Sequence, residues 1–179
     1  MKTLLADFHI HSLLSPCAEV EMTPHHLMMR AAAAGLGAIA LTDHNASANL
    51  PAMIRLQEKY QVKVFPGMEV ECKEEAHLVV LFDKMSQMAV WQHQVDKALS
   101  GRLNQPEKLG AQFVVDEEDN LVREEPRMLL GPLTLTAAEV VTAVNNLGGL
   151  CFAAHVDRPA YSLLMSLGFL PPEQGLAAA

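Results

Sequence analysis

The stretch ADFHIHS, residues 6–12, places His9 and His11 two positions apart in a run of strand-like residues near the start of the chain. Side chains at positions i and i+2 of a strand point to the same face of a sheet, so the two imidazoles would share one face. That geometry suits a metal ion. In a chain with eight histidines the pair is also compatible with chance, so the rest of the sequence has to decide between the two interpretations.

Composition indicates one globular domain. The chain has 179 residues, half of them hydrophobic, which is enough for a sizeable core. A formal net charge of −8 disfavours long nucleic acid as a partner. The three cysteines lack CxxC spacing, which favours a reducing compartment, and no segment reaches the ~20 apolar residues of a membrane span. We therefore expect a soluble, cytoplasmic protein without membrane contact.

Strand and helix patterns alternate along the chain and predict an α/β fold. Thr23 and Pro24 are typical of a helix start, and Thr136 with Glu139 forms a capping box for another helix. The repeated strand–helix–strand order implies a parallel sheet or barrel. The expected strands cover residues 3–8, 38–42, 62–71, 77–82 and 150–154, and the expected helices cover residues 25–35, 50–60 and 137–146.

A charge-rich segment at about residues 91–132 interrupts this pattern and is predicted to be an insertion. Within it, QFVVDEEDNLVRE, residues 112–124, indicates a β-hairpin that turns at Asp119 and Asn120. The insertion is either a lid over a substrate or an inert surface segment, and both interpretations stay open.

The remaining candidate ligands fall mostly where a strand becomes a loop. In parallel α/β folds the carboxyl ends of strands converge on one side of the molecule, where such folds place their chemistry. His77 opens its strand, so the sequence does not place it at that side. The strand-end candidates are His9, His11, His44, Glu69 and His155, whereas His25, His26 and His93 lie on helix patterns and are expected to be surface or interface residues.

Imidazoles with one carboxylate suit zinc, manganese or iron rather than calcium, because nitrogen donors are borderline-soft. A carboxylate can also bridge two ions. Paired metal ions lower the pKa of a shared water, which permits phosphate-ester hydrolysis without a nucleophilic side chain. Neither a GxSxG nor a GxxxxGK[ST] motif is present to suggest another chemistry.

Six segments, in this order, resemble the successive motifs of the PHP family, the polymerase and histidinol phosphatase phosphoesterases. They are DFHIHS, SPCAEVEMTP, ALTDHN, GMEVEC, AHLVVLF and AAHVDRPAYS. The resemblance implies one PHP domain over residues 1–179, folded as a distorted (β/α)7 barrel with two or three divalent metal ions at the strand ends. By the same resemblance His9 and His11 bind a first metal, Glu69 bridges to a second, and His77 and His155 complete the second site.

The resemblance implies two further roles. His44 would be a ligand of a third metal, and Asp7 and Asp43 would orient the imidazoles. Arg158 follows the last histidine and would bind a substrate phosphate, although an ion pair with Asp157 is the alternative. Glu69, Asp43 and Arg158 are the candidate catalytic residues.

Two departures from the family pattern affect these expectations. Ser15, Pro16 and Cys17 stand where many members have SDG, and Cys17 is either a zinc ligand or a small buried residue. The closing Asp-x-His motif is absent, because the chain stops at PPEQGLAAA. We expect a barrel without its C-terminal strands, in a shortened gene product or an experimental truncation. Its open edge would need a homo-oligomer or the missing C-terminal segment as cover.

The sequence therefore predicts a metal-dependent phosphoesterase that hydrolyses a small phosphorylated substrate, a nucleotide or a phosphorylated metabolite, with a metal-activated water. One alternative is a nuclease that trims the ends of short oligonucleotides. A second alternative, favoured by the absent Asp-x-His motif, is a PHP-like metal-binding module without catalytic activity.

Overall fold

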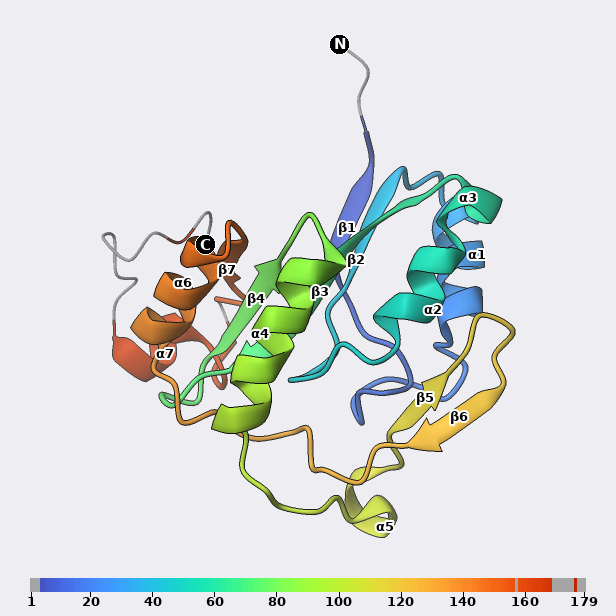
Figure 1. The fold of residues 1–179 in the computed structure, drawn as a ribbon. Coiled ribbons are helices and arrows are strands. Elements are labelled where there is room, and N and C mark those ends of the chain that lie inside the picture. Colours follow the sequence, from blue (N-terminus) through green and yellow to red (C-terminus); the bar gives the residue numbers. More distant parts are fainter. Residues whose placement is uncertain (1–3, 157, 169–175, 177–179) are drawn as a thin grey trace.

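The computed structural model describes residues 4–156, 158–168 and 176, and in this part of the chain helices and strands alternate as predicted (Figure 1). The elements in chain order are β1 (Ala6–Ile10), α1 (Pro24–Ala33), β2 (Ala38–Leu41), α2 (Leu50–Arg55), α3 (Gln57–Tyr60), β3 (Lys63–Glu71), β4 (His77–Leu81), α4 (Met85–Ala98), α5 (Pro106–Leu109), β5 (Phe113–Val115), β6 (Leu121–Glu124), α6 (Ala137–Asn146), β7 (Leu150–Ala153) and α7 (Leu163–Leu167). None of the helices in these described ranges is long and apolar enough to cross a membrane.

The predicted helix starts are confirmed. The Thr23 hydroxyl accepts a hydrogen bond from the His26 N–H, and Pro24 occupies the first turn of α1, where its missing N–H has no helical partner to lose. Thr136 and Glu139 form the reciprocal capping box of α6. These signals are local, because each capping hydrogen bond joins residues within the first turn of its helix.

The main sheet has the strand order β1–β2–β3–β4–β7, and the prediction that it is parallel is wrong for half of it. β1, β2 and β3 pair in parallel, whereas β4 pairs antiparallel with both β3 and β7. The physical reason is the short connection from Glu71 to His77, because a parallel crossover needs a dozen or more residues. The mixed α/β class is confirmed, and the seven-unit barrel stays a prediction.

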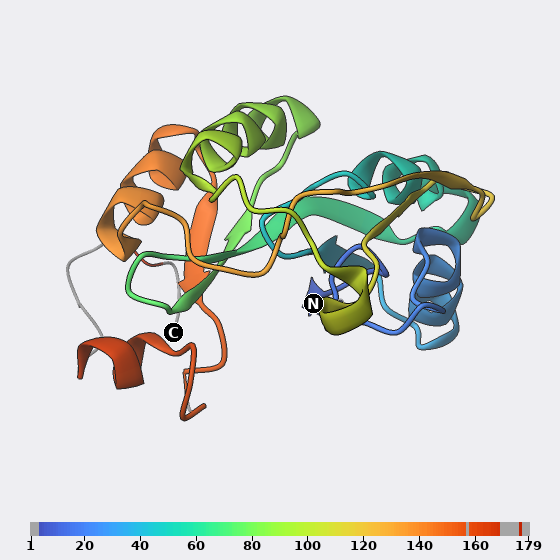
Figure 2. The same ribbon diagram turned by 90° about the horizontal axis from the view of Figure 1, so that it is seen from below.

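The two faces of the sheet have different surroundings. Even-numbered residues of β3 and β4, such as Met68, Val70 and Leu78, pack into the large core, to which Trp91 of α4 and Val140 of α6 also belong. Figure 2 shows the curled sheet from below, with α4 and α6 along one side. The odd-numbered residues of β3 and β4, such as Phe65, Val79 and Leu81, point to the opposite face. There they form a smaller apolar group with residues from β2 and from β7 and its end: Ala40, Phe152 and Ala154.

The predicted hairpin is confirmed, with β5 and β6 joined by a turn in which Asp119 has a φ of 65°. α4 continues to Ala98, with Trp91 and Val95 in the core, so the first residues of the expected excursion are helical. That residues 91–132 are an insertion stays a prediction. The segment after α4 is hydrogen-bonded to a loop of the main sheet: Asn49 donates to the Phe113 carbonyl at 3.1 Å and accepts from the Val115 N–H at 3.0 Å. A lid function stays a prediction.

Candidate metal centre

Glu69 lies at the centre of five imidazoles although it is only 1% exposed. Its Oε2 atom is 3.2 Å from His9 Nε2, 3.1 Å from His11 Nε2 and 3.5 Å from His44 Nδ1. Its Oε1 atom is 3.0 Å from His77 Nδ1 and 3.1 Å from His155 Nε2. The two oxygens of one carboxylate therefore face two separate groups of nitrogens.

The mixed topology explains how His77 joins this group. Because β4 runs antiparallel to β3, the start of β4 lies beside the end of β3, and Glu71 is paired with His77. β7 is antiparallel to β4, so its carboxyl end, which leads to His155, returns to the same side. The antiparallel direction of β4, which the sequence pattern did not predict, therefore brings His77 and His155 together beside Glu69 Oε1.

Close strand packing positions Glu69 against the end of β2. A bridge pairs His44 with Glu69 beyond the regular strand, and the Asn45 N–H donates to the Glu69 carbonyl at 2.9 Å. A Cβ atom at Gly67 would lie 2.7 Å from Thr42 Cγ2 and 2.8 Å from the Leu41 carbonyl oxygen, so glycine is needed for this approach. Asn45 adopts a φ of 50° as the chain turns away.

The Asp43 carboxylate makes its hydrogen bonds to the loop after β1 and not to an imidazole ring. Its carboxylate accepts hydrogen bonds from the Ser12 N–H, the Ser12 hydroxyl and the Ser15 hydroxyl, all at 2.7 Å. Ser15 Oγ lies 3.2 Å from His11 Nδ1 and accepts from the His44 N–H at 3.1 Å. Asp43 thus acts on the histidines through Ser15, which sequence reasoning had passed over. Burial raises the pKa of Asp43.

Asp7, the other residue expected to orient imidazoles, accepts a hydrogen bond from the backbone N–H of His9 at 3.1 Å rather than from its ring. His25, His26 and His93 do not line the cavity at the centre, in agreement with their expected surface positions. His25 instead lies 3.8 Å from Asp119 at the hairpin turn.

Two residues beside His77 were missed by sequence reasoning. Glu71 is buried on the same face as Glu69, with Oε2 3.9 Å from His77 Nε2. The Tyr161 ring stacks on the His77 ring at a centroid distance of 4.8 Å, and its carbonyl accepts from the His77 N–H at 2.9 Å. The period-two spacing of GMEVE could have indicated Glu71, whereas Tyr161 reaches His77 only through the fold.

The buried groups of the centre have shifted pKa values, and Glu69 stays ionised. Burial favours a raised pKa for its carboxyl group, but hydrogen bonds from His11, His77 and His9 outweigh it and hold the pKa well below its usual range. His44 has the opposite shift: burial lowers its pKa to about 3, so its imidazole is neutral. Burial favours a lower pKa for His77 too, yet hydrogen bonds to Glu69 and Glu71 raise it to about 9.

We expect the metal-free protein to lose stability as pH rises from about 6.5 to about 9, because folded His77 holds its proton more tightly than the unfolded chain does. This contribution is fully present below pH 6.5 and is lost as pH passes the folded-state pKa of about 9. Urea unfolding in EDTA across this range measures it. His77→Gln should flatten the curve, and a parent protein with constant stability over the same range would contradict the prediction.

A cavity of about 630 Å³ opens over the centre. Cys17 and Arg158 line it, together with Leu130 and Tyr161. Cys17 is exposed to solvent as a residue, so the interpretation as a small buried residue is wrong. The protein atoms around its thiol displace some water there, and this desolvation, with the nearby Glu69, raises the pKa of the thiol. Arg158 is also exposed, and its expected alternative partner, Asp157, lies outside the described residues.

The donor set fits divalent metal ions. His9, His11 and Glu69 form one group whose ligand atoms all lie within 4.8 Å of one another, and His44, Glu69 and His77 form another. Neutral imidazole nitrogens with a carboxylate suit zinc, manganese or iron. His155 Nδ1 is buried without a hydrogen-bond partner among the described residues, whereas its Nε2 faces Glu69.

The chain is an α/β protein whose mixed sheet gathers five imidazoles around one carboxylate, which makes this place a candidate metal centre. The chain belongs to the PHP domain family, whose model matches residues 7–130. No curated protein matches the chain in sequence.

Solved structures share the fold at low identity. A candidate metal-dependent phosphoesterase from Bifidobacterium adolescentis is 18% identical, with a TM-score of 0.67 over 99% of this chain and 77% of its own. The lesion-specific Endonuclease Q from Pyrococcus furiosus is 23% identical, with a TM-score of 0.62 over 89% of this chain and 36% of its own. Endonuclease Q bound to a 27-mer duplex with an abasic lesion at the active site has a TM-score of 0.65 at 23% identity, over 96% of this chain and 39% of its own.

Proposed function

We propose that the chain is a metal-dependent phosphoesterase that hydrolyses a small phosphorylated molecule, such as a nucleotide or a phosphorylated metabolite. The observation that carries the proposal is the division of the Glu69 carboxylate, with Oε2 toward His9, His11 and His44 and Oε1 toward His77 and His155. A carboxylate placed in this way can hold two cations side by side. Bound cations would supply an activated water and neutralise charge on the phosphoryl oxygens.

The side chains around the centre have separate tasks in this proposal. Glu69 and the imidazoles on its two sides would hold the cations, and His77 would give up its proton to offer a neutral nitrogen donor. Asp43 and Ser15 fix the loop that carries His11. Arg158, at the wall of the cavity, binds the substrate phosphate and orients the ester bond toward the centre. The cavity of about 630 Å³ suits a substrate the size of a nucleotide.

A nuclease is the second candidate, supported by the fold shared with Endonuclease Q. The chain spans just over a third of that protein's length, so the parts of Endonuclease Q outside the match have no counterpart in this comparison. A formal net charge of −8 favours short rather than long nucleic acid as a substrate.

The deciding experiment is a hydrolysis panel with the purified protein after EDTA treatment and resupply of manganese, zinc or iron. The panel contains phosphomonoesters, nucleotides, short oligonucleotides and a duplex with an abasic site. Metal-dependent hydrolysis of the small esters supports the phosphoesterase proposal. Cleavage confined to the nucleic acids supports the nuclease, and bound metal with no turnover on any substrate leaves a non-catalytic metal-binding module.

Replacing Arg158 with Ala should raise KM for a phosphomonoester by roughly 10- to 100-fold, since a hydrogen bond to a charged group contributes about 1.5–3 kcal/mol. Arg158→Lys keeps the positive charge but not the planar guanidinium, so its KM should lie between those of the parent and of Arg158→Ala. Steady-state kinetics under saturating metal measure the effect, with Arg102→Ala on the inserted segment as the control. An unchanged KM in Arg158→Ala would remove this residue from the proposed site.

A further inference from the structure

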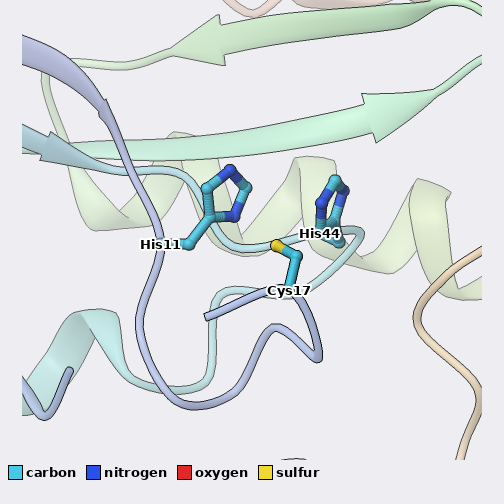
Figure 3. A group of neighbouring side chains, drawn as sticks. All are labelled: His11, Cys17 and His44. Atoms are coloured by element: carbon cyan, nitrogen blue, oxygen red, sulfur yellow. The ribbon is translucent and has the colours of Figure 1, made fainter. Parts of the chain in front are cut away.

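The loop after β1 places the Cys17 thiol next to the imidazoles of His11 and His44. His11, Cys17 and His44 each offer one donor atom, and these three atoms all lie within 4.8 Å of one another. Figure 3 shows the Cys17 sulfur on the side of its loop that faces both rings. The His11 and His44 rings stack with centroids 4.6 Å apart and an interplanar angle of 27°.

This arrangement is held in place by the buried network around Asp43. Ser12 and Ser15 donate to the Asp43 carboxylate, and the Ser15 carbonyl accepts from the Ala18 N–H at 2.9 Å, which closes a turn around Cys17. Cys17 is exposed at the cavity wall, whereas Cys72 and Cys151 are buried in the core. Of the three thiols only that of Cys17 is both accessible and next to nitrogen donors.

The donor set of this trio differs from the one around Glu69. The Glu69 groups combine imidazoles with a carboxylate, and this donor set can bind manganese, iron or zinc. A thiolate with two imidazoles favours zinc and disfavours manganese, which prefers oxygen donors. His11 and His44 both belong also to the Glu69 groups, so cations at the two positions compete for these two imidazoles, and Cys17 is the donor that distinguishes the trio.

We propose that His11, Cys17 and His44 form a zinc-selective position with a thiolate ligand, and that this position sets which metal the centre retains. The inference rests on the proposed metal centre but not on its turnover. When zinc binds, the Cys17 S–H bond breaks, the proton leaves to solvent and the sulfur lone pair forms the metal bond, with no change of oxidation state. The open cavity leaves room for a fourth ligand.

Cobalt(II) substitution tests the thiolate bond directly, because sulfur bound to cobalt gives a near-ultraviolet charge-transfer band that nitrogen and oxygen donors lack. The EDTA-treated protein is titrated with cobalt and compared with Cys17→Ser and Cys151→Ala. We expect the band in the parent and in Cys151→Ala, and its loss in Cys17→Ser, whose visible ligand-field bands should remain. Circular dichroism confirms that the variants are folded.

Each outcome of the titration decides one question. Ligand-field bands in the parent without a charge-transfer band that depends on Cys17 overturn the zinc position and leave the Glu69 centre standing. A Cys17-dependent band in a protein that hydrolyses no phosphate ester keeps the zinc position and overturns the proposed function. The absence of any cobalt spectrum overturns both.

Metal competition gives the quantitative readout. Cys17→Ser should weaken zinc binding by roughly 10- to 100-fold or more while changing manganese affinity little. In the parent, zinc should protect Cys17 from a maleimide and manganese should not, with the buried Cys72 and Cys151 unlabelled in the native protein. Equal loss of zinc and manganese affinity in Cys17→Ser, or equal protection by both ions, would overturn the selectivity.

Discussion

Replacing Glu69 with Gln should lower metal-dependent hydrolysis by roughly 10²- to 10⁴-fold, which corresponds to the several kcal/mol that bound cations contribute to a phosphoryl transition state. Gln keeps the shape of the side chain but removes the charge, and one of its two terminal atoms becomes an NH2 group that cannot bind a cation. Because Oε1 and Oε2 face different imidazoles, a single substitution affects both halves of the centre.

To test this prediction, the metal content and the hydrolysis rate of Glu69→Gln are both measured and compared with those of the parent. Glu69→Gln should retain fewer ions per chain after gel filtration, and added manganese or zinc should not restore the rate. Glu58→Gln on the exposed surface of α3 makes the same chemical change away from the centre and should behave as the parent. Circular dichroism should show a folded variant, because the neighbouring Met68 and Val70 keep the core contacts. A Glu69→Gln protein as fast as the parent under saturating metal would exclude the binuclear arrangement.

Replacing Asp43 with Ala should cost about 3–5 kcal/mol of folding stability, the largest effect on stability that we expect from a single residue of the site. The carboxylate is 1% exposed and accepts three hydrogen bonds at 2.7 Å. Alanine leaves the Ser12 N–H and the Ser12 and Ser15 hydroxyls without that acceptor in a buried place. Urea unfolding of the metal-free protein measures the loss.

The same substitution should also weaken metal binding by roughly 10- to 100-fold in protein that remains folded, because Ser15 no longer holds His11 and the His44 backbone in place. Asp83→Ala, at an exposed position after β4, is the matched control and should change neither quantity. A stable Asp43→Ala protein with normal metal affinity would show that the loop is held by its other contacts.

Local features of the fold could be predicted because they depend on residues close in sequence. Thr23 with Pro24 and Thr136 with Glu139 determine helix starts through hydrogen bonds within one turn. The hairpin turn at Asp119 is equally local. The direction of β4 was predicted incorrectly because strand periodicity is the same for parallel and antiparallel pairing, and only the length of the connection distinguishes them.

The sequence by itself determined which residue types are available: the His-x-His pair at residues 9 and 11, Glu69 on one face of its strand, and histidines at the ends of others. Tertiary structure alone decided that β7 pairs with β4 and brings His155 to the centre, that Ser15 connects Asp43 to His11, and that Cys17 faces the cavity. The physical reason is range. Side-chain alternation and helix caps act over one to four positions, whereas the centre joins residues 9 and 155 by strand pairing that no local pattern encodes.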